Sequence, residues 1–219
     1  MADLDPMVAD AFRRAEKVGA FYSHQLESRR QLRAGKNVIL ATATASGKTA
    51  AFNPTILERL LQDPQSRALY LFPLVALAMD QVGRLNRLNE ELPEANRLEI
   101  AVFNNQADKE QKQRALRAAN RIVVTTPESL HYILLPKPYP NWKAFFRELR
   151  FIVLDEAHLY KGVFGANMSG IVRRVLARCA RERSPGKPLP QVIVASATLS
   201  DPLRLAEDLT SLPKEEFGP

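Results

Sequence analysis

Short apolar runs alternate along the chain with longer stretches of helical spacing. Six runs predict buried strands, at Val38–Ala41, Ala68–Phe72, Leu98–Phe103, Arg121–Thr125, Phe151–Leu154 and Gln191–Ala195. The segments between them predict helices, at Lys48–Leu61, Val75–Leu88, Asp108–Ala119 and from the loop Lys161–Gly165 to about Arg183. Strands that alternate with helices predict an α/β fold with a mostly parallel sheet and helices on both faces.

Two further helices are expected ahead of the first strand. Apolar residues at helical spacing predict one over Leu4–Val18. Ser23 is a residue type that caps helix N-termini, so we expect it to cap a second helix over His24–Arg33. Gly35 then provides the residue that most readily ends a helix.

The stretch from Val38 to Ala50 has the layout of a phosphate-binding loop. A short apolar strand leads into small residues, and Gly47-Lys48-Thr49 opens the next helix. In such a loop, backbone N–H groups cradle phosphates, the Lys reaches the β/γ-phosphates and the Thr hydroxyl holds Mg²⁺. Thr42 replaces the first Gly of the usual pattern, and an ordinary strand, turn and helix start would also fit. The expected ATP-binding residues of this loop are Thr44, Ala45, Ser46, Gly47, Lys48 and Thr49.

Two acidic residues follow the apolar run Phe151–Leu154. Ligands of open α/β sheets bind outside the carboxyl ends of the strands, which is where Asp155 and Glu156 are expected. A P-loop NTPase needs an acid there for the metal and a group that orients the attacking water. We therefore assign Asp155 to Mg²⁺ together with Thr49, and Glu156 to the water, with Lys48 as the third catalytic residue.

Other polar residues also fall at the ends of predicted strands. Pro73 follows one strand, Thr126–Glu128 another, and Ser196–Thr198 the last. Because the carboxyl ends of parallel strands share one edge of a sheet, these residues and the two acids predict one functional site.

Composition narrows the class of protein. The 219 residues are 46% hydrophobic, enough for a sizeable core, and carry a formal charge of +7 with a pI of about 9.7, which is compatible with a nucleic-acid partner. The single cysteine, Cys179, excludes an internal disulfide framework. The acidic N-terminus lacks the features of a signal peptide, and no apolar run has the length of a membrane span. We therefore expect a cytoplasmic or nucleoid-associated protein that is neither secreted nor membrane-bound.

Two stretches leave alternatives open. Residues 132–146 are rich in Pro and aromatic side chains, which fits a long connection packed over the core or, less readily, a base-stacking surface. Arg174, Arg178 and Arg181 form a stripe at helical spacing, which is usually a solvated face and less often a nucleic-acid contact.

The set of motifs resembles the first RecA-like lobe of superfamily 2 DExH/DEAD helicases. In the order of that family, it comprises YSHQ (residues 22–25), ATASGKT (43–49), FPLVALAMDQ (72–81), TTPESL (125–130), DEAH (155–158) and SAT (196–198). YSHQ, TASGKT and DEAHLYKGVFGAN are similar to MrfA/YprA-type DNA-repair helicases, which are RecQ-like and related to the Lhr group. The Gly-Asp-containing loop that such helicases usually carry is replaced here by Asn104-Asn105-Gln106.

The resemblance implies further roles for individual residues. Tyr22 and Gln25 would bind the adenine of ATP, while His158, Ser196 and Thr198 would couple the γ-phosphate to lobe closure; a strand end and helix cap is the alternative for the last two. Single-stranded nucleic acid, DNA rather than RNA, would contact Pro73, Leu74, Thr125, Thr126, Pro127 and Glu128.

The resemblance also implies a domain organisation. Residues 1–35 would hold the N-terminal helices with YSHQ, residues 36–211 the ATP-binding lobe, and residues 212–219 the start of an inter-lobe linker. No motif of a second RecA-like lobe is present, so that lobe would have to come from a longer chain or a partner. The leading hypothesis is the ATP-binding lobe of a DNA helicase or translocase. A nucleotide-dependent binding module without unwinding and an RNA helicase lobe are alternatives, and the guanine-reading N-K-x-D of a GTPase is absent.

Overall fold

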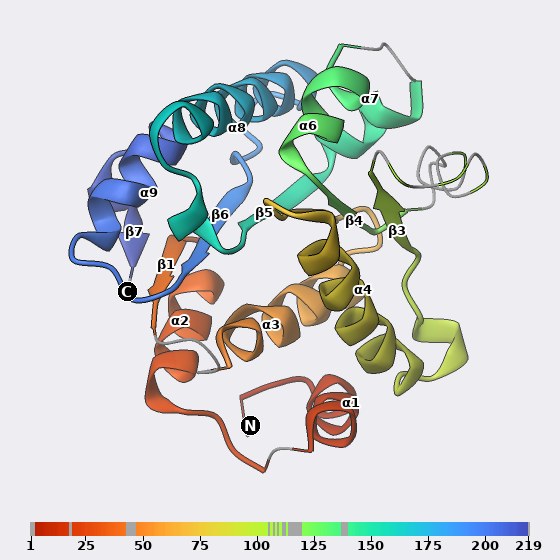
Figure 1. The fold of residues 1–219 in the computed structure, drawn as a ribbon. Helices are drawn as coiled ribbons and strands as arrows, with labels where there is room; N and C mark the ends of the chain where they lie inside the picture. Colours follow the sequence, from red (N-terminus) through yellow and green to blue (C-terminus); the bar gives the residue numbers. More distant parts are fainter. Residues whose placement is uncertain are drawn as a thin grey trace.

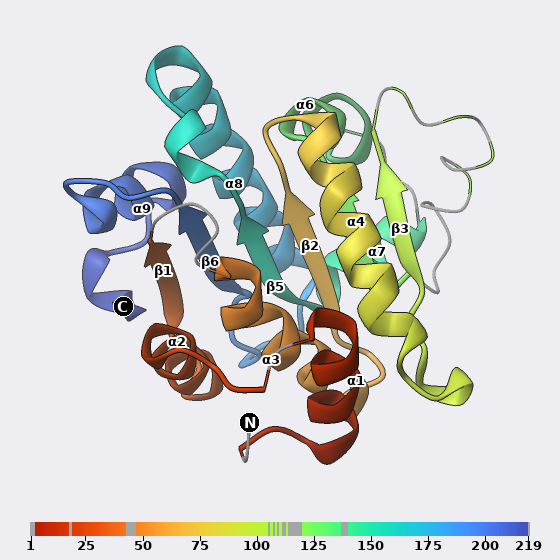
Figure 2. The same cartoon turned by 60° about the horizontal axis from the view of Figure 1, so that its bottom comes forward.

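A computed structural model describes residues 3–17, 19–42, 47–104, 106, 108, 110, 113, 120–136 and 140–218. It contains a seven-stranded parallel sheet in the order β3-β4-β2-β5-β6-β1-β7 (Figures 1 and 2). The strands are β1 (Asn37–Ala41), β2 (Arg67–Leu71), β3 (Ile100–Phe103), β4 (Ile122–Thr125), β5 (Leu149–Leu154), β6 (Gln191–Ser196) and β7 (Phe217–Gly218). The six predicted strands are confirmed, to within two residues at their ends.

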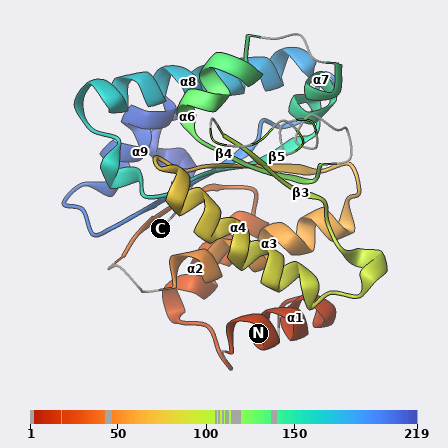
Figure 3. The ribbon, with the colours of Figure 1, turned by 45° about the vertical axis from the view of Figure 1, so that its right-hand side comes forward.

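Helices cover both faces of the sheet, as the alternating pattern predicts (Figure 3). One face carries α1 (Pro6–Glu16), α2 (Ser23–Arg33), α3 (Lys48–Gln62) and α4 (Val75–Glu90). The other carries α6 (Pro127–Ser129), α7 (Pro140–Arg147), α8 (Gly162–Glu182) and α9 (Pro202–Thr210). Single-turn helices are found at Glu94–Asn96 (η1), Leu130–Leu134 (η2, a π-helix), Ala157–Leu159 (η3) and Lys214–Glu216 (η4).

Each central strand contributes side chains to two separate cores. Along β1, Val38 and Leu40 are buried under α1 to α4, while Ile39 between them is buried on the opposite face. This alternation follows from the pleat of a strand, whose successive side chains point to opposite faces. Because both faces are covered by helices, most positions of the central strands are apolar and buried.

Two local predictions are wrong in position. Ser23 is the first residue of α2 and not its cap; Tyr22 precedes the helix, and its N–H donates to the side chain of Gln25 at 2.9 Å. Of the expected loop Lys161–Gly165, only Lys161 precedes α8 as its N-cap; Gly162, at φ 55°, is the first helical residue. In each case the helix begins earlier than the local residue types suggest. Most of the helix predicted at 108–119 lies outside the described residues.

The aromatic segment after β4 divides into two parts. Trp142, Phe145 and Phe146 on α7 are buried in the core between the sheet and α8, so this part is the packed connection that composition favours. Tyr132, on η2, remains exposed. The tail after α9 adds the short strand β7 beside β1, where Phe217 pairs with Asn37. Its assignment as an inter-lobe linker stays a prediction.

Candidate functional site

The carboxyl ends of β1, β5 and β6 lie next to one another because these three strands are neighbours in the sheet (Figure 2). Strand β1 leads towards α3, which begins at Lys48, while β5 is followed at once by Asp155 and Glu156. The edge predicted from the sequence is thus formed by strands whose register is fixed by continuous pairing, for example Leu154 with Val194 and Ala41 with Ser196.

The phosphate-loop end of the site is formed by Gly47 and the start of α3. Gly47 has a left-handed backbone, φ 70°, and its carbonyl oxygen accepts from the Gln25 side chain at 3.0 Å. The positive φ favours glycine here, and a Cβ atom would lie 2.8 Å from Nε2 of Gln25, so the end of that side chain would have to move. Lys48 is buried, and its ammonium donates to the carbonyl of Thr42 at 3.2 Å.

The expected loop residues Thr44, Ala45 and Ser46 lie outside the described residues. Tyr22, the other residue expected to contact adenine, is 67% exposed, and its ring stacks on that of His24 with centroids 5.8 Å apart. Gln25 is buried and joins the backbone of Tyr22 to that of Gly47. Gln25, expected at the adenine end of the nucleotide site, is thereby in direct contact with Gly47 at the phosphate-loop end.

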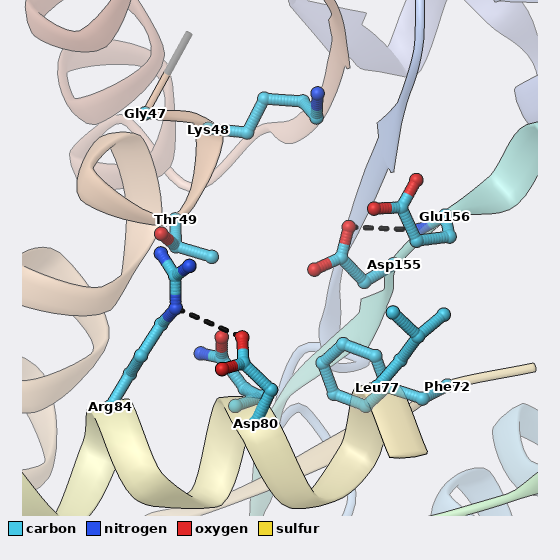
Figure 4. A pocket seen from close by; sticks show the side chains of 10 residues that line it. Gly47, Lys48, Thr49, Phe72, Leu77, Asp80, Arg84, Asp155 and Glu156 are labelled. Carbon is cyan, nitrogen blue, oxygen red and sulfur yellow. Dashed lines mark hydrogen bonds and ion pairs between the residues drawn. The ribbon is translucent and has the colours of Figure 1, made fainter. Parts of the chain in front are cut away.

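Asp155 and Glu156 face Lys48 and Thr49 across a pocket of about 160 Å³ (Figure 4). Asp155 accepts from the N–H of Glu156 at 2.8 Å and is almost fully buried. Burial raises the pKa of Asp155 to about 6, because a carboxylate loses hydration there and the neighbouring Glu156 adds negative charge. Glu156 has a left-handed backbone, φ 50°, which is strained for a residue with a side chain.

Helix α4 contributes four residues to this pocket for which the sequence predicted no individual role. Leu77, Asp80 and Arg84 lie on one side of α4 and line the pocket (Figure 4), as does Gln81. Arg84 pairs with Asp80 at 3.1 Å and lines the same pocket as Thr49 (Figure 4). Gln81 is buried, and its Nε2 has no hydrogen-bond partner among the described residues. Leu77, Asp80 and Gln81 fall within the motif FPLVALAMDQ (72–81), whereas Arg84 lies beyond it.

The end of β6 is connected to the acidic pair through His158. Its Nδ1 accepts from the backbone N–H of Ala197 at 3.3 Å and lies 3.4 Å from the carboxylate of Glu156. Ser196 is fully buried and its hydroxyl has no partner among the described residues, whereas Thr198 is exposed. Of the three residues assigned to coupling, His158 therefore contacts both the acidic pair and the segment after β6. Ser196 is the buried last residue of β6, and Thr198 lies at the surface.

The residues assigned to nucleic acid also lie along this edge, though few present a side chain to solvent. Thr125 and Thr126 are buried, and the Thr126 hydroxyl caps α6 by accepting from the N–H of Ser129 at 3.4 Å. Pro73 and Pro127 are buried, while Leu74 and Glu128 are exposed. Any contact through the threonines would therefore involve backbone groups, and their roles remain predictions.

Residues of the pocket suit a nucleotide with its metal. Asp155 is a desolvated carboxylate, which a bound cation would stabilise in its charged form. The buried amide of Gln81 offers a donor that no protein group uses among the described residues. Gly47 provides the close backbone approach that phosphate loops need. None of the described helices combines the length and apolar character of a transmembrane span.

Comparison with known proteins agrees with this site. Residues 22–205 match the DEAD/DEAH box helicase family over most of the chain. The chain belongs to this family. The matched range includes Gln25, Lys48 and the acidic pair, and it ends inside α9. Both the family and the RecA-like α/β fold expected from the motifs are thereby confirmed.

Several known helicases are similar over most of this chain. The uncharacterized ATP-dependent helicase YprA of Bacillus subtilis (strain 168) is 36% identical over 197 residues, 90% of this chain and 25% of YprA. The ATP-dependent helicase HRQ1 of Saccharomyces cerevisiae is 35% identical over 192 residues, 86% of this chain and 17% of HRQ1. A crystal structure of the DUF1998 helicase MrfA bound to DNA and AMPPNP superimposes with a TM-score of 0.87 at 33% identity, covering 96% of this chain and 28% of MrfA.

These comparisons confirm the narrower likeness to the MrfA/YprA group. The structure of Mss116p bound to ssRNA and AMP-PNP has a TM-score of 0.79 at 21% identity, which shows a shared fold alone. The chain spans 17% to 28% of the lengths of YprA, HRQ1 and MrfA.

Proposed function

We propose that this chain is the ATP-binding lobe of an ATP-dependent DNA helicase or translocase, in which ATP hydrolysis drives movement along single-stranded DNA. The observation that carries the proposal is the placement of Lys48 and Thr49 across one pocket from Asp155 and Glu156 (Figure 4). A P-loop lysine and hydroxyl opposite an acidic pair is the arrangement that phosphoryl transfer to water requires.

Each of these side chains would have a distinct task. Lys48 would neutralise charge on the β- and γ-phosphates, and Thr49 and Asp155 would hold Mg²⁺. When bound, the metal supplies positive charge that offsets the charge developing on the phosphoryl oxygens. Glu156 would orient the attacking water and accept its proton, since its carboxylate is only partly buried and reaches the pocket. Gln25 would hydrogen-bond the adenine edge, with Tyr22 packing nearby.

The preference for DNA rests on the relatives. MrfA has been crystallised bound to DNA and AMPPNP, and that protein is 33% identical to this chain. The charge of +7 agrees with a phosphate backbone as partner. Contacts to phosphates fix the position of a strand without reading its sequence, as a translocase requires.

Hydrolysis by this lobe alone is expected to be slow. An arginine finger stabilises the charge of the phosphoryl transition state and is worth roughly 10³- to 10⁵-fold in rate. In helicases of two RecA-like lobes, such arginines come from the second lobe, whose motifs this sequence does not contain. Nucleotide binding needs only the groups present here and should be retained.

The test compares nucleotide binding and hydrolysis in this chain. We expect a fluorescent ATP analogue to bind with Mg²⁺, and Lys48→Ala to abolish that binding, while the exposed control Lys214→Ala has no effect. Hydrolysis with and without single-stranded DNA should stay near background, in the wild type as in Glu156→Gln. Absence of nucleotide binding, or binding that survives Lys48→Ala, would refute the proposed ATP site.

A fast hydrolysis rate would change the proposal in a defined way. If single-stranded DNA stimulates hydrolysis and Glu156→Gln abolishes it, the catalytic assignment holds but this lobe completes its own site. The matched control is Glu207→Gln, an exposed glutamate on α9 outside the pocket. A fast rate that Glu156→Gln and Glu207→Gln leave equally unchanged would refute the role of Glu156.

A further inference from the structure

A groove outside the ATP pocket is lined by residues from both the aromatic segment 132–146 and the arginine stripe on α8. The groove, about 310 Å³ in volume, lies between the α6–η2 segment and α8, which are neighbours in Figures 1 and 3. Its lining includes Pro127, Glu128, His131, Tyr132, Phe164 and Arg174. Tyr132 comes from the aromatic segment and Arg174 from the arginine stripe, 42 positions apart.

Tyr132 differs from the other aromatic residues of its segment. Its side chain is 70% exposed, whereas Trp142 and Phe146 are at most 2% exposed. Its ring and that of His131 form a T-shaped pair, with centroids 4.4 Å apart and an interplanar angle of 65°. This contact helps to fix the orientation of the tyrosine, so that its ring can serve as a platform at the side of the groove.

Arg174 likewise differs from the two other arginines of its stripe. Arg178 is mostly buried and pairs with Glu182 at 2.9 Å, and Arg181 also contacts Glu182. Arg174 contacts the imidazole Nδ1 of His131 and the carbonyl of Gly170, and no carboxylate among the described residues pairs with it. Its positive charge is therefore not offset by a described ion pair.

We propose that this groove binds one nucleotide of single-stranded nucleic acid, with the base stacked on Tyr132 and the phosphate held by Arg174. The inference rests on the proposed function, since it assigns part of the nucleic-acid path. Stacking on an exposed aromatic ring together with a nearby cation is how single strands are bound without sequence preference. Glu128, which also lines the groove, suits an amino group on a base edge and disfavours a second phosphate.

The position of the groove agrees with this assignment. Pro127 is the first residue of α6 and follows the carboxyl end of β4 after only Thr126. Two strands further along the sheet, β5 ends at the acidic pair of the ATP pocket. A strand that follows this edge would therefore pass both the residues assigned to nucleic acid and the Tyr132–Arg174 groove.

Fluorescence anisotropy with a labelled oligothymidylate of about 12 nucleotides tests the proposal. Stacking is worth about 1–3 kcal/mol per base, so Tyr132→Ala should weaken binding roughly 5- to 150-fold, while Tyr132→Phe retains it. Arg174→Ala should also weaken binding and should lower the slope of log affinity against log salt by about 0.7, the value for one phosphate contact on a single strand. Arg181→Ala, on the same helix but outside the groove, is the matched control.

The outcomes separate this inference from the proposed function. If the wild type binds the oligonucleotide but Tyr132→Ala and Arg174→Ala bind like Arg181→Ala, the groove has another role and the inference is wrong. If the wild type does not bind at low salt, the nucleic-acid part of the proposed function fails and the inference fails with it. Unchanged binding of the ATP analogue in each variant would show that the fold is intact.

Photocrosslinking provides a second readout. An oligonucleotide carrying 5-iododeoxyuridine crosslinks to aromatic side chains that stack on the base. We expect the crosslinked peptide to contain Tyr132 and the yield to fall in Arg174→Ala. A crosslink confined to peptides outside the groove would contradict the inference.

Discussion

The raised pKa of Asp155 predicts that this carboxylate destabilises the ligand-free protein at neutral pH. Its pKa is about 6 in the folded protein, against 3.8 without burial, and each unit corresponds to about 1.4 kcal/mol. The difference amounts to about 3 kcal/mol. Because the folded-state pKa is the higher one, the folded protein is favoured below about pH 3.8, and this advantage is lost as the pH rises through about 6.

Asp155→Asn isolates this effect. The amide stays neutral at every pH. It also retains an oxygen that can accept the hydrogen bond which the N–H of Glu156 donates to Asp155 at 2.8 Å. Without Mg²⁺ or nucleotide, the variant should exceed the wild type in unfolding free energy by as much as about 3 kcal/mol at about pH 8, and by far less at about pH 4. For a domain of this size, that corresponds to a melting temperature higher by about 6–12 °C.

The measurement is urea or thermal unfolding of both proteins in EDTA at the two pH values. Other titrating groups affect both proteins alike. The change with pH in the difference between their unfolding free energies therefore reports Asp155. Asp208→Asn is the control, since Asp208 is 67% exposed on α9 and should shift stability by less than about 0.5 kcal/mol. A difference between Asp155→Asn and wild type that is equal at both pH values would refute the reasoning.

Three further predictions concern the pocket and the core. Gly47→Ala should lower stability by about 1–2 kcal/mol in urea unfolding, because the backbone is left-handed at φ 70°. It should also weaken binding of an ATP analogue, because the new Cβ would displace the end of the Gln25 side chain. Arg84→Ala should weaken binding of Mg²⁺-ATP about 10-fold in titrations, because it removes a cation from the pocket that Lys48 and Thr49 also line. Arg87 is exposed one turn later on α4, so Arg87→Ala should leave this binding unchanged. The Cys179 thiol, buried with its pKa raised to about 12, should react with iodoacetamide at about pH 8 only after unfolding.

Much of the fold could be predicted because the strands are buried on both faces. A parallel strand covered by helices on each side has to be apolar throughout, so runs such as Phe151–Leu154 stand out in the sequence. The site follows from topology, since parallel strands place Lys48 and Asp155 at the same edge wherever the intervening helices lie.

Features that depend on how helices dock could not be predicted. Asp80, Gln81 and Arg84 have the composition of a solvated helix face, and only the packing of α4 against the sheet turns them into the pocket. The left-handed backbone of Glu156 is set by the turn it occupies, and its residue type gives no indication of it. The groove at Tyr132 and Arg174 likewise depends on how η2 and α8 approach each other.

The order of the strands also determines when the site can form during folding. Strand β1 lies between β6 and β7, and Val38 pairs with Ile193, a partner 155 positions later in the sequence. Contacts between such distant residues close large loops and form slowly. A ribosome would have to release residues as far as Ser196 before β1, which leads to the phosphate loop, could pair with β6. Nucleotide binding would therefore report the last stage of folding, and a chain released early would hold the P-loop sequence without a stable pocket.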